Sequence, residues 1–191
     1  MAFARPKKRE PVGEPELFEY ALGALARKMR TVRDLKRLMQ PRAHEGEQGE
    51  RDMDAVIARL TDLKYLSDTR FAADYTRLRK ENQGFGRRRV QQDLAQKGVA
   101  KELVSTTLAA AYDDADEVEL ARRYCERKRM KQPADQKETV RTMNRLLRAG
   151  YSSNAIFKLL RAWNVPDEAI PAIGGDSDSY AEPDEALRID E

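Results

Sequence analysis

An internal repeat that couples an apolar pattern to a turn glycine constrains the fold most strongly. When residues 90–108 are aligned with residues 142–160, the apolar positions and the glycines coincide at an offset of 52 residues. The matched pairs are Leu94 with Leu146, Gly98 with Gly150, Val104 with Ile156, and Leu108 with Leu160. A looser copy occurs earlier, because Leu38 precedes Leu94 by 56 residues and Val56 precedes Val104 by 48. A period of about 50 residues predicts tandem modules that each contact mainly their neighbours.

Apolar residues within each repeat recur at the spacing of an α-helix. One stripe, for example, contains Phe18, Leu22, Leu25 and Met29, and another contains Met53, Val56, Ile57, Leu60 and Leu63. This period of 3–4 residues is typical of amphipathic helices, and no run alternates as a β-strand does. We therefore predict an all-α fold of tandem three-helix modules, about three repeats and nine helices, arranged in an elongated row.

Signals for helix ends divide the chain at regular intervals. Thr31 and Asp135 each stand three residues before an acidic residue, as in a capping box. Gly98 and Gly150 follow apolar stretches and can adopt the left-handed conformation that ends a helix. These signals predict helices that start near residues 16, 31, 52, 68, 86, 100, 114, 137 and 152.

Grouping the helices in threes predicts the domain organisation. The polar stretch PRAHEGEQGER, residues 41–51, is interpreted as a loop inside the first module. The expected segments are a disordered basic N-terminus (1–14), three modules (15–66, 67–112 and 113–165) and an acidic, disordered tail (166–191).

Charge is unevenly distributed along the chain. Lysine and arginine number 36 against 33 acidic residues, a net charge of +3. Residues 167–191 contain nine acidic residues and one arginine, whereas residues 14–166 have a net charge of +8. A basic body with an acidic tail indicates contact with a polyanion or an acidic protein groove, for which the tail would compete. The alternative is ordinary solvated helix faces followed by a disordered tail.

No stretch is apolar enough to predict a membrane span or a signal peptide, so we expect a cytoplasmic protein. Its single cysteine fits a reducing compartment.

Few residues are suited to catalysis. His44 is the only histidine and Cys125 the only cysteine, so a zinc-type ligand set is missing from the sequence. Cys125 shares an apolar stripe with Val118 and Ala121, which favours a small core residue over a nucleophile. The glycines of residues 84–86 lack the other residues of a phosphate-binding loop and are interpreted as a flexible joint. We expect a non-enzymatic protein with no catalytic residue, metal or cofactor.

Residues 65–98 are the most informative stretch. In order, they contain an aromatic-Leu-x-Asp motif, a Phe-Ala pair with a following aromatic, an arginine, a Gly-x-Gly with basic residues, and a Lys-Gly turn. The positions are Tyr65, Leu66, Asp68, Phe71, Ala72, Tyr75, Arg79, Gly84, Gly86, Arg87, Val90, Leu94, Lys97 and Gly98. Their order resembles the RecX family of bacterial RecA modulators, and the resemblance extends over roughly residues 16–165. The inserted loop 41–51 and the acidic tail depart from the family pattern.

The resemblance implies a curved, modular protein that lies in the groove of the RecA–DNA filament. It implies binding to RecA protein and inhibition of its ATPase, strand-exchange and co-protease activities, with roles in homologous recombination, DNA repair and the SOS response. It also implies secondary affinity for single- or double-stranded DNA without sequence preference. We expect a monomer that does not contact membranes.

Basic residues cluster around the same stretch. Three consecutive arginines in the first turn of a helix are unfavourable with its dipole, which indicates a compensating phosphate or acidic partner that also binds the helix N–H groups. Arginines that extend into water are the alternative. The proposed partner- and DNA-binding residues are Arg70, Arg77, Arg79, Lys80, Arg87, Arg88, Arg89, Arg122 and Arg129. Tyr75, Tyr124 and Trp163 are candidates for base stacking, although their apolar stripes favour a place in the core.

Two other functions are compatible with the sequence. Residues 86–111, two helices joined at Gly98, superficially resemble a helix-turn-helix, which would make the protein a sequence-specific DNA binder. Recurrence of this unit at residues 137–163 with different surface residues favours a structural module instead. A generic helical scaffold is the remaining alternative.

Overall fold

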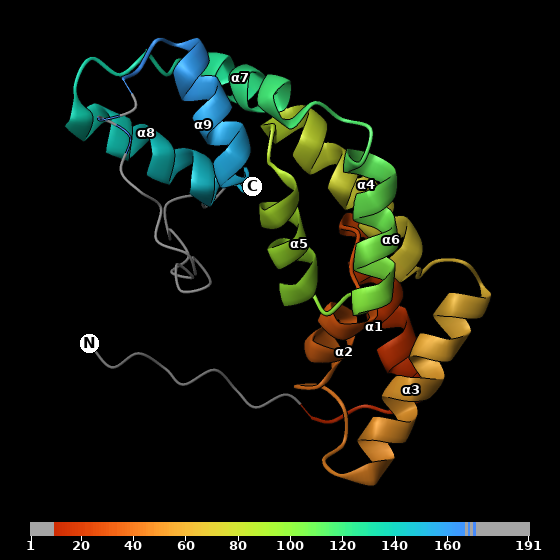
Figure 1. Ribbon diagram of the computed structural model, residues 1–191. Helices are drawn as coiled ribbons and strands as arrows, with labels where there is room; N and C mark the ends of the chain where they lie inside the picture. Colours follow the sequence, from red (N-terminus) through yellow and green to blue (C-terminus); the bar gives the residue numbers. More distant parts are fainter. Residues whose placement is uncertain (1–9, 167, 169, 171–191) are drawn as a thin grey trace, which may run out of the picture. The chain divides into compact units, whose positions relative to one another are not determined.

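Helices account for nearly all the regular structure of the residues described by the computed structural model, which are 10–166, 168 and 170 (Figure 1). The first part of the described chain contains α1 (Glu14–Arg27), α2 (Val32–Met39), α3 (Glu47–Asp62), α4 (Asp68–Leu78) and the π-helix η1 (Arg79–Gln83). It continues with α5 (Arg87–Gln96), α6 (Lys101–Tyr112), α7 (Glu117–Arg127), α8 (Gln136–Arg148) and α9 (Ser153–Ala162). The all-α prediction is confirmed, and each of the nine α-helices described starts within five residues of its predicted start.

Two compact units divide these helices. The first contains the described residues up to Asn82 together with Val90–Asp114, and the second contains Gln83–Arg89 and the described residues from Ala115 onward. The first turn of α5 therefore packs with the second unit, whereas the rest of α5 packs with the first. The module boundaries at residues 66/67 and 112/113 stay a prediction.

In the first unit, α1 packs against α3, and α4 packs against α6 (Figure 1). The core of the first unit contains Phe18, Met53, Val56 and Leu60 from the predicted stripes, together with Leu17 and Leu35, which lie outside them. Burying such a side chain fully contributes about 1.5–3 kcal/mol to stability. Met29 and Leu63 belong to the predicted stripes but are 47% and 50% exposed, so the stripes are wrong at these two positions.

Polar contacts join α2 to the helices that follow it in the first unit. Thr31 caps α2 by accepting a hydrogen bond from the Asp34 N–H (3.1 Å). The same hydroxyl donates to the carbonyl of Lys97 (2.7 Å). The Val32 N–H donates to the Asp68 carboxylate (2.9 Å) in the first turn of α4. The N-terminus of α2 is thus held by a side chain of α4 and by a backbone carbonyl in the turn after α5.

The second unit is built around α7 and α9, with α8 packed on α9. Its core contains Cys125, Leu146, Ile156 and Leu160, each at most 1% exposed. The assignment of Cys125 to the core is confirmed.

Predicted helix caps agree with the structure. Asp135 accepts from the Glu138 N–H (2.7 Å) at the start of α8. Gly98 and Gly150 have φ angles of 76° and 91°, in the left-handed region. Either Ser67 or Asp68 is suited to capping the fourth helix, and the structure uses Ser67, which accepts from the Arg70 N–H (3.2 Å).

The interpretation of residues 41–51 as a loop is wrong for its second half, because α3 begins at Glu47 rather than near residue 52. Gly46, with a φ of 81°, turns the chain into the helix, and Glu47 forms an i,i+4 ion pair with Arg51 (2.9 Å). Gly49 faces the backbone of His44, where a Cβ would lie 1.8 Å from the carbonyl oxygen. The polar residues at the start of α3 thus belong to a solvated helix turn, although their composition is also typical of a loop.

The flexible-joint interpretation of residues 84–86 is also wrong. The Gly86 N–H donates to the Ala149 carbonyl (2.8 Å), and the Tyr151 hydroxyl donates to the Gly84 carbonyl (2.5 Å). A Cβ on Gly86 would lie 2.4 Å from the Gly150 oxygen, and one on Gly150 would lie 2.3 Å from the Arg89 nitrogen. These glycines permit a backbone-to-backbone contact within the second unit.

The predictions of disordered ends fall largely outside the described residues, which exclude 1–9, 167, 169 and 171–191. Within the described part of the N-terminal segment, Val12 forms an isolated parallel bridge with Ala43, and its N–H donates to the Arg42 carbonyl (2.8 Å). Residues 10–13 are therefore tied to the first unit, contrary to the prediction for that end of the segment.

Candidate nucleic-acid and partner interface

The half-buried side chain of Arg79 is bound within its own unit. Its guanidinium donates to the Tyr75 hydroxyl (2.5 Å), and its Nε lies 3.4 Å from Asp93 Oδ2. The Tyr75 hydroxyl in turn donates to the carboxylate of Asp93 (3.1 Å), a residue that is only 8% exposed. Burial raises the pKa of Tyr75, so its hydroxyl remains a donor at neutral pH. Arg79 is therefore the counter-ion of a buried carboxylate, and removing it would leave that charge uncompensated.

Lys80 is likewise engaged inside the first unit. Its ammonium donates to the carbonyl of Ala111 (2.5 Å) at the C-terminal end of α6 and lies 5.2 Å from the centre of the Tyr112 ring. A cation at the C-terminus of a helix is stabilised by the helix dipole. Arg79 and Lys80 are thus both half-buried and engaged within the first unit, and their part in binding a partner stays a prediction.

Arg77 and Arg122 form ion pairs along their own helices. Arg77 lies 3.2 Å from Asp74 and 3.7 Å from Glu81, and Arg122 lies 3.5 Å from Glu119. Exposed pairs of this kind contribute about 0.3–0.5 kcal/mol each to stability. Their charges are locally compensated, whereas Arg70, in the first turn of α4, is exposed and lines a pocket described below.

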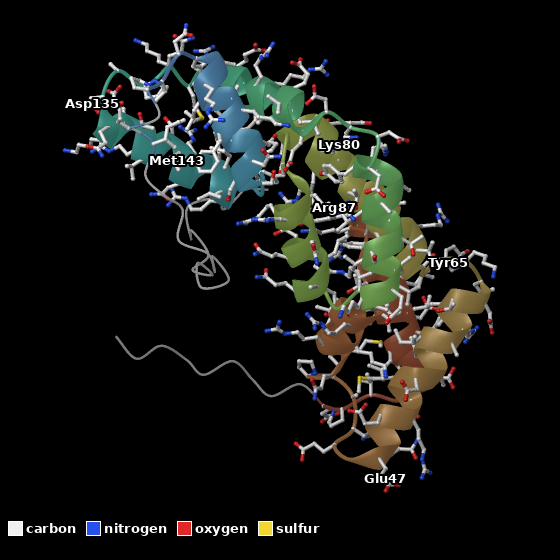
Figure 2. The ribbon with its side chains drawn as sticks, in the orientation of Figure 1. Glu47, Tyr65, Lys80, Arg87, Asp135 and Met143 are labelled. Carbon is white, nitrogen blue, oxygen red and sulfur yellow. The ribbon has the colours of Figure 1, made fainter. Side chains whose placement is uncertain are left out.

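The three consecutive arginines open α5 as predicted, and one of the N–H groups at this helix end is bound by a backbone carbonyl of the chain itself. The Arg88 N–H donates to the Gly150 carbonyl (3.2 Å), and Gly150 lies against the Arg89 nitrogen. The carbonyls at the C-terminal end of α8 thus compensate the positive end of α5. Arg87, which is labelled in Figure 2, and Arg88 are exposed. Arg89 is half-buried, with its guanidinium 5.7 Å from the centre of the Phe85 ring.

The other sequence candidates differ in their surroundings. Arg129 lies two residues beyond the end of α7, in an exposed turn where its φ is 50°. Tyr124 is a core residue, 6% exposed and edge-on to Tyr151 at 5.8 Å. Tyr75 and Trp163 are half-buried.

One basic surface was missed in the sequence. The exposed face of α8 has cations at intervals of four, four and three residues: Lys137, Arg141, Arg145 and Arg148. We call this set the α8 stripe. Asp135 and Met143 mark the course of the helix in Figure 2. Glu138 is the one acidic residue of α8, and it accepts from the Ala134 N–H (2.9 Å). Helical phase alone would have revealed the stripe, which spans about 16 Å.

Comparison with known proteins decides the family. The profile described as "RecX, second three-helix domain" matches residues 67–108. The Regulatory protein RecX of Trichlorobacter lovleyi is 32% identical over 142 residues, which cover 73% of this chain and 90% of the relative. The chain belongs to the RecX family.

Other relatives in the family cover still more of the chain. The Regulatory protein RecX of Mycobacterium ulcerans is 28% identical over 165 residues, covering 85% of this chain and 92% of the relative. The crystal structure of RecX from Lactobacillus salivarius has a TM-score of 0.61 at 20% identity and covers 79% of this chain and 96% of that one. This last similarity extends the agreement to the fold.

Most residues of the RecX motif have structural roles here. Leu66 and Phe71 are buried, and Phe71 stacks on Tyr75 with ring centres 5.5 Å apart. Asp68 accepts from the Val32 N–H, and burial raises the pKa of its carboxyl group. Lys97 lies 3.8 Å from Asp34. Tyr65 differs from these residues because its side chain is mainly in solvent.

Among the described residues, no group of three or more His, Cys, Asp or Glu side chains could hold a metal ion. Burial raises the pKa of the Cys125 thiol to about 11, which keeps it protonated at neutral pH and unsuited to nucleophilic attack. None of the helices described is long and apolar enough to cross a membrane.

Proposed function

We propose that this RecX-family chain binds the RecA recombinase and the RecA–DNA filament, and that it inhibits the ATPase, strand-exchange and co-protease activities. Membership of a family whose relatives are named regulatory proteins carries the proposal. The protein would act by binding, in the cytoplasm where a recombinase meets chromosomal DNA. This proposal requires no cofactor, and it is formulated for a monomer.

Exposed cations are the proposed contacts with the filament. Of the sequence candidates, Arg70, Arg87, Arg88 and Arg129 are exposed, and the α8 stripe adds four more exposed cations. Because Arg79 and Lys80 serve the interior of the first unit, we exclude them from the proposed surface. The half-buried Arg89 and the ion-paired Arg77 and Arg122 are secondary candidates.

Direct binding to DNA would be non-specific. The helix that would enter the major groove in a helix-turn-helix, α6, packs on α4 through Val104 and Leu108. Its exposed residues include Lys101, Glu102 and Ser105, a set with little net charge. Spaced cations on α8 favour contacts with phosphates, which carry no sequence information. We expect no duplex sequence to bind a thousandfold better than random DNA at fixed salt.

The ATPase of RecA provides the direct test. The purified chain is titrated into RecA on single-stranded DNA, and ATP hydrolysis is measured at steady state. We expect the rate to fall at ratios at or below one chain per RecA, because many modest contacts along a filament give avidity. An unchanged rate at a several-fold excess of the chain would contradict the proposal.

A DNA-excess control separates binding to RecA from removal of its DNA. In a parallel titration, DNA is raised well above the amount that saturates RecA. Inhibition that persists indicates contact with the recombinase. Inhibition that disappears would mean that the chain only sequesters DNA, and the proposed regulation of RecA would be rejected.

A further inference from the structure

Two of the most exposed apolar side chains among the described residues meet at one pocket of the first unit. Met29 and Tyr65 are 47% and 60% exposed, and both line a hollow of about 120 Å³. The hollow lies where the segment after α1 meets the α3–α4 turn and the start of α4, and Figure 2 shows Tyr65 on that turn. Phe71, which is buried, contributes to its lining.

Tyr65 is held on a rigid backbone although its ring lies in solvent. The Tyr65 N–H donates to the Leu60 carbonyl (3.0 Å), and the preceding Lys64 turns with a φ of 62°. Leu66, the next residue, is 1% exposed and anchors the turn in the core. An aromatic ring fixed in this way loses little conformational entropy when it is covered by a partner. Within the RecX motif, it is the aromatic residue that the fold itself leaves uncovered.

Cations surround the apolar side chains. Arg30, Lys64 and Arg70 all line the pocket. Arg30 Nε is buried and has no hydrogen-bond acceptor within the described residues. A buried donor without a partner costs about 1–3 kcal/mol, which an incoming acceptor would recover. The one acidic residue of the lining, Asp74, is paired with Arg77 (3.2 Å). The pocket therefore combines an apolar floor with an excess of positive charge.

We propose that this pocket binds a segment of a partner protein that carries one large apolar side chain next to carboxylates. The apolar side chain would enter between Met29, Tyr65 and Phe71, and a carboxylate would accept from Arg30. A nucleotide base fits less well, because a side of the pocket lined by Leu25 and Met29 offers no partner for the polar edge of a base. The inference goes beyond the proposed function, since it holds whichever protein supplies the segment.

Methyl NMR of the full chain tests this pocket. Methionine methyl groups are labelled, and the Met29 signal is assigned with Met29→Leu. The probes are the blocked peptides Asp-Glu-Leu-Glu-Asp and Asp-Glu-Phe-Glu-Asp, a matched Asp-Glu-Ser-Glu-Asp peptide, and an oligothymidylate of about eight nucleotides. We expect the leucine and phenylalanine peptides to shift the Met29 signal saturably, and the serine peptide to bind about tenfold more weakly or not at all.

Three outcomes would overturn the proposal. If no peptide moves the Met29 signal, the pocket is not a binding site for such a segment. If the serine peptide shifts the signal as much as the others, binding depends on charge attraction alone and the apolar side chain does not enter the pocket. A shift produced by the oligonucleotide but by none of the peptides reassigns the pocket to nucleic acid.

Surface variants provide a matched pair. Tyr65→Ala should weaken binding of the leucine peptide at least fivefold, whereas Leu78→Ala, at another exposed apolar residue that does not line the pocket, should leave it unchanged. Equal effects of the two would also contradict the proposal. Arg30→Gln should weaken binding of the acidic peptides. Circular dichroism checks whether this variant folds as the wild type does. The wild-type titration decides the question even if a variant is unstable.

Discussion

Single residues of the second unit show how strongly the fold depends on backbone contact. Gly86 and Gly150 are far apart in the chain, yet their backbones meet so closely that neither residue has room for a methyl group. Tyr151, fully buried beside them, has its hydroxyl within 3.0 Å of the Leu120 carbonyl and 2.5 Å of that of Gly84. Hydrogen bonds and close backbone contact thus hold residues 84–86 against the turn after α8, which lies more than sixty residues later in the chain.

The glycine contact predicts a localised loss of stability. Gly150→Ala should destabilise the second unit by about 2–4 kcal/mol, because the new Cβ overlaps the Arg89 nitrogen and the φ of 91° disfavours alanine. Trp163, the only tryptophan, lies in this unit, so its fluorescence during thermal unfolding measures the effect.

Gly23→Ala is the matched control. A Cβ at Gly23, inside α1, would meet no other atom within 4 Å. Alanine there should be neutral or stabilise by up to about 1 kcal/mol, as measured by circular dichroism. If the two variants unfold alike, the close contact at Gly150 is not a determinant of stability.

At the scale of elements, helices differ in whether their cations are compensated. Each of α3, α4 and α7 pairs arginine with an acidic residue one turn away, as in Arg51 with Glu47 and Arg123 with Glu119 (3.0 Å). In the α8 stripe, only Arg141 has an acidic residue of its own helix one turn away, and the carboxylate of that residue, Glu138, accepts from the Ala134 N–H. This contrast distinguishes a helix that presents positive charge from helices that neutralise it internally.

The α8 stripe predicts a change in the salt dependence of DNA binding. Replacing Arg141, Arg145 and Arg148 together with glutamine should lower the slope of log K against log salt by about 2–3, since each phosphate contact contributes about 0.7–0.9. Binding is measured by fluorescence anisotropy at several salt concentrations.

A control triple variant removes the same number of charges from ion pairs. Replacing Arg51, Arg59 and Arg123 with glutamine should change the slope by less than about one. Equal slopes for the two triple variants would show that α8 is not a preferred DNA contact.

At the scale of the whole molecule, charge is segregated between the body and the C-terminal end. Residues 171–191 contain seven acidic residues and one arginine, whereas the stretch 14–166 is strongly basic. Oppositely charged segments of one chain attract each other over distances up to the Debye length, which is about 8 Å at physiological salt. We expect a tail of this composition to compete with phosphate for basic surfaces of the body.

Removing the tail should therefore strengthen DNA binding. We expect a chain ending at residue 170 to bind single-stranded DNA several-fold more tightly than the full chain, with the difference shrinking as salt is raised. A full-length variant with the tail acids changed to their amides separates charge from length and should reproduce the truncation. Unchanged affinity in both variants would mean that the tail does not compete.

Local patterns determined much about this protein before any tertiary contact was known. The 3.6-residue period, the caps at Thr31 and Asp135, and the turn glycines predicted the helices, because these signals act between residues at most four positions apart. The ordered motif of residues 65–98 indicated the RecX family, which the comparisons confirmed.

The tertiary structure decided which cations face solvent. Arg79 meets an aspartate 14 residues later, Lys80 a carbonyl 31 residues later, and the Arg88 N–H a carbonyl 62 residues later. No local pattern encodes such pairings, since they depend on how helices pack. Composition thus revealed that the chain is rich in positive charge, whereas packing determined which charges stabilise the fold and which remain exposed for a partner.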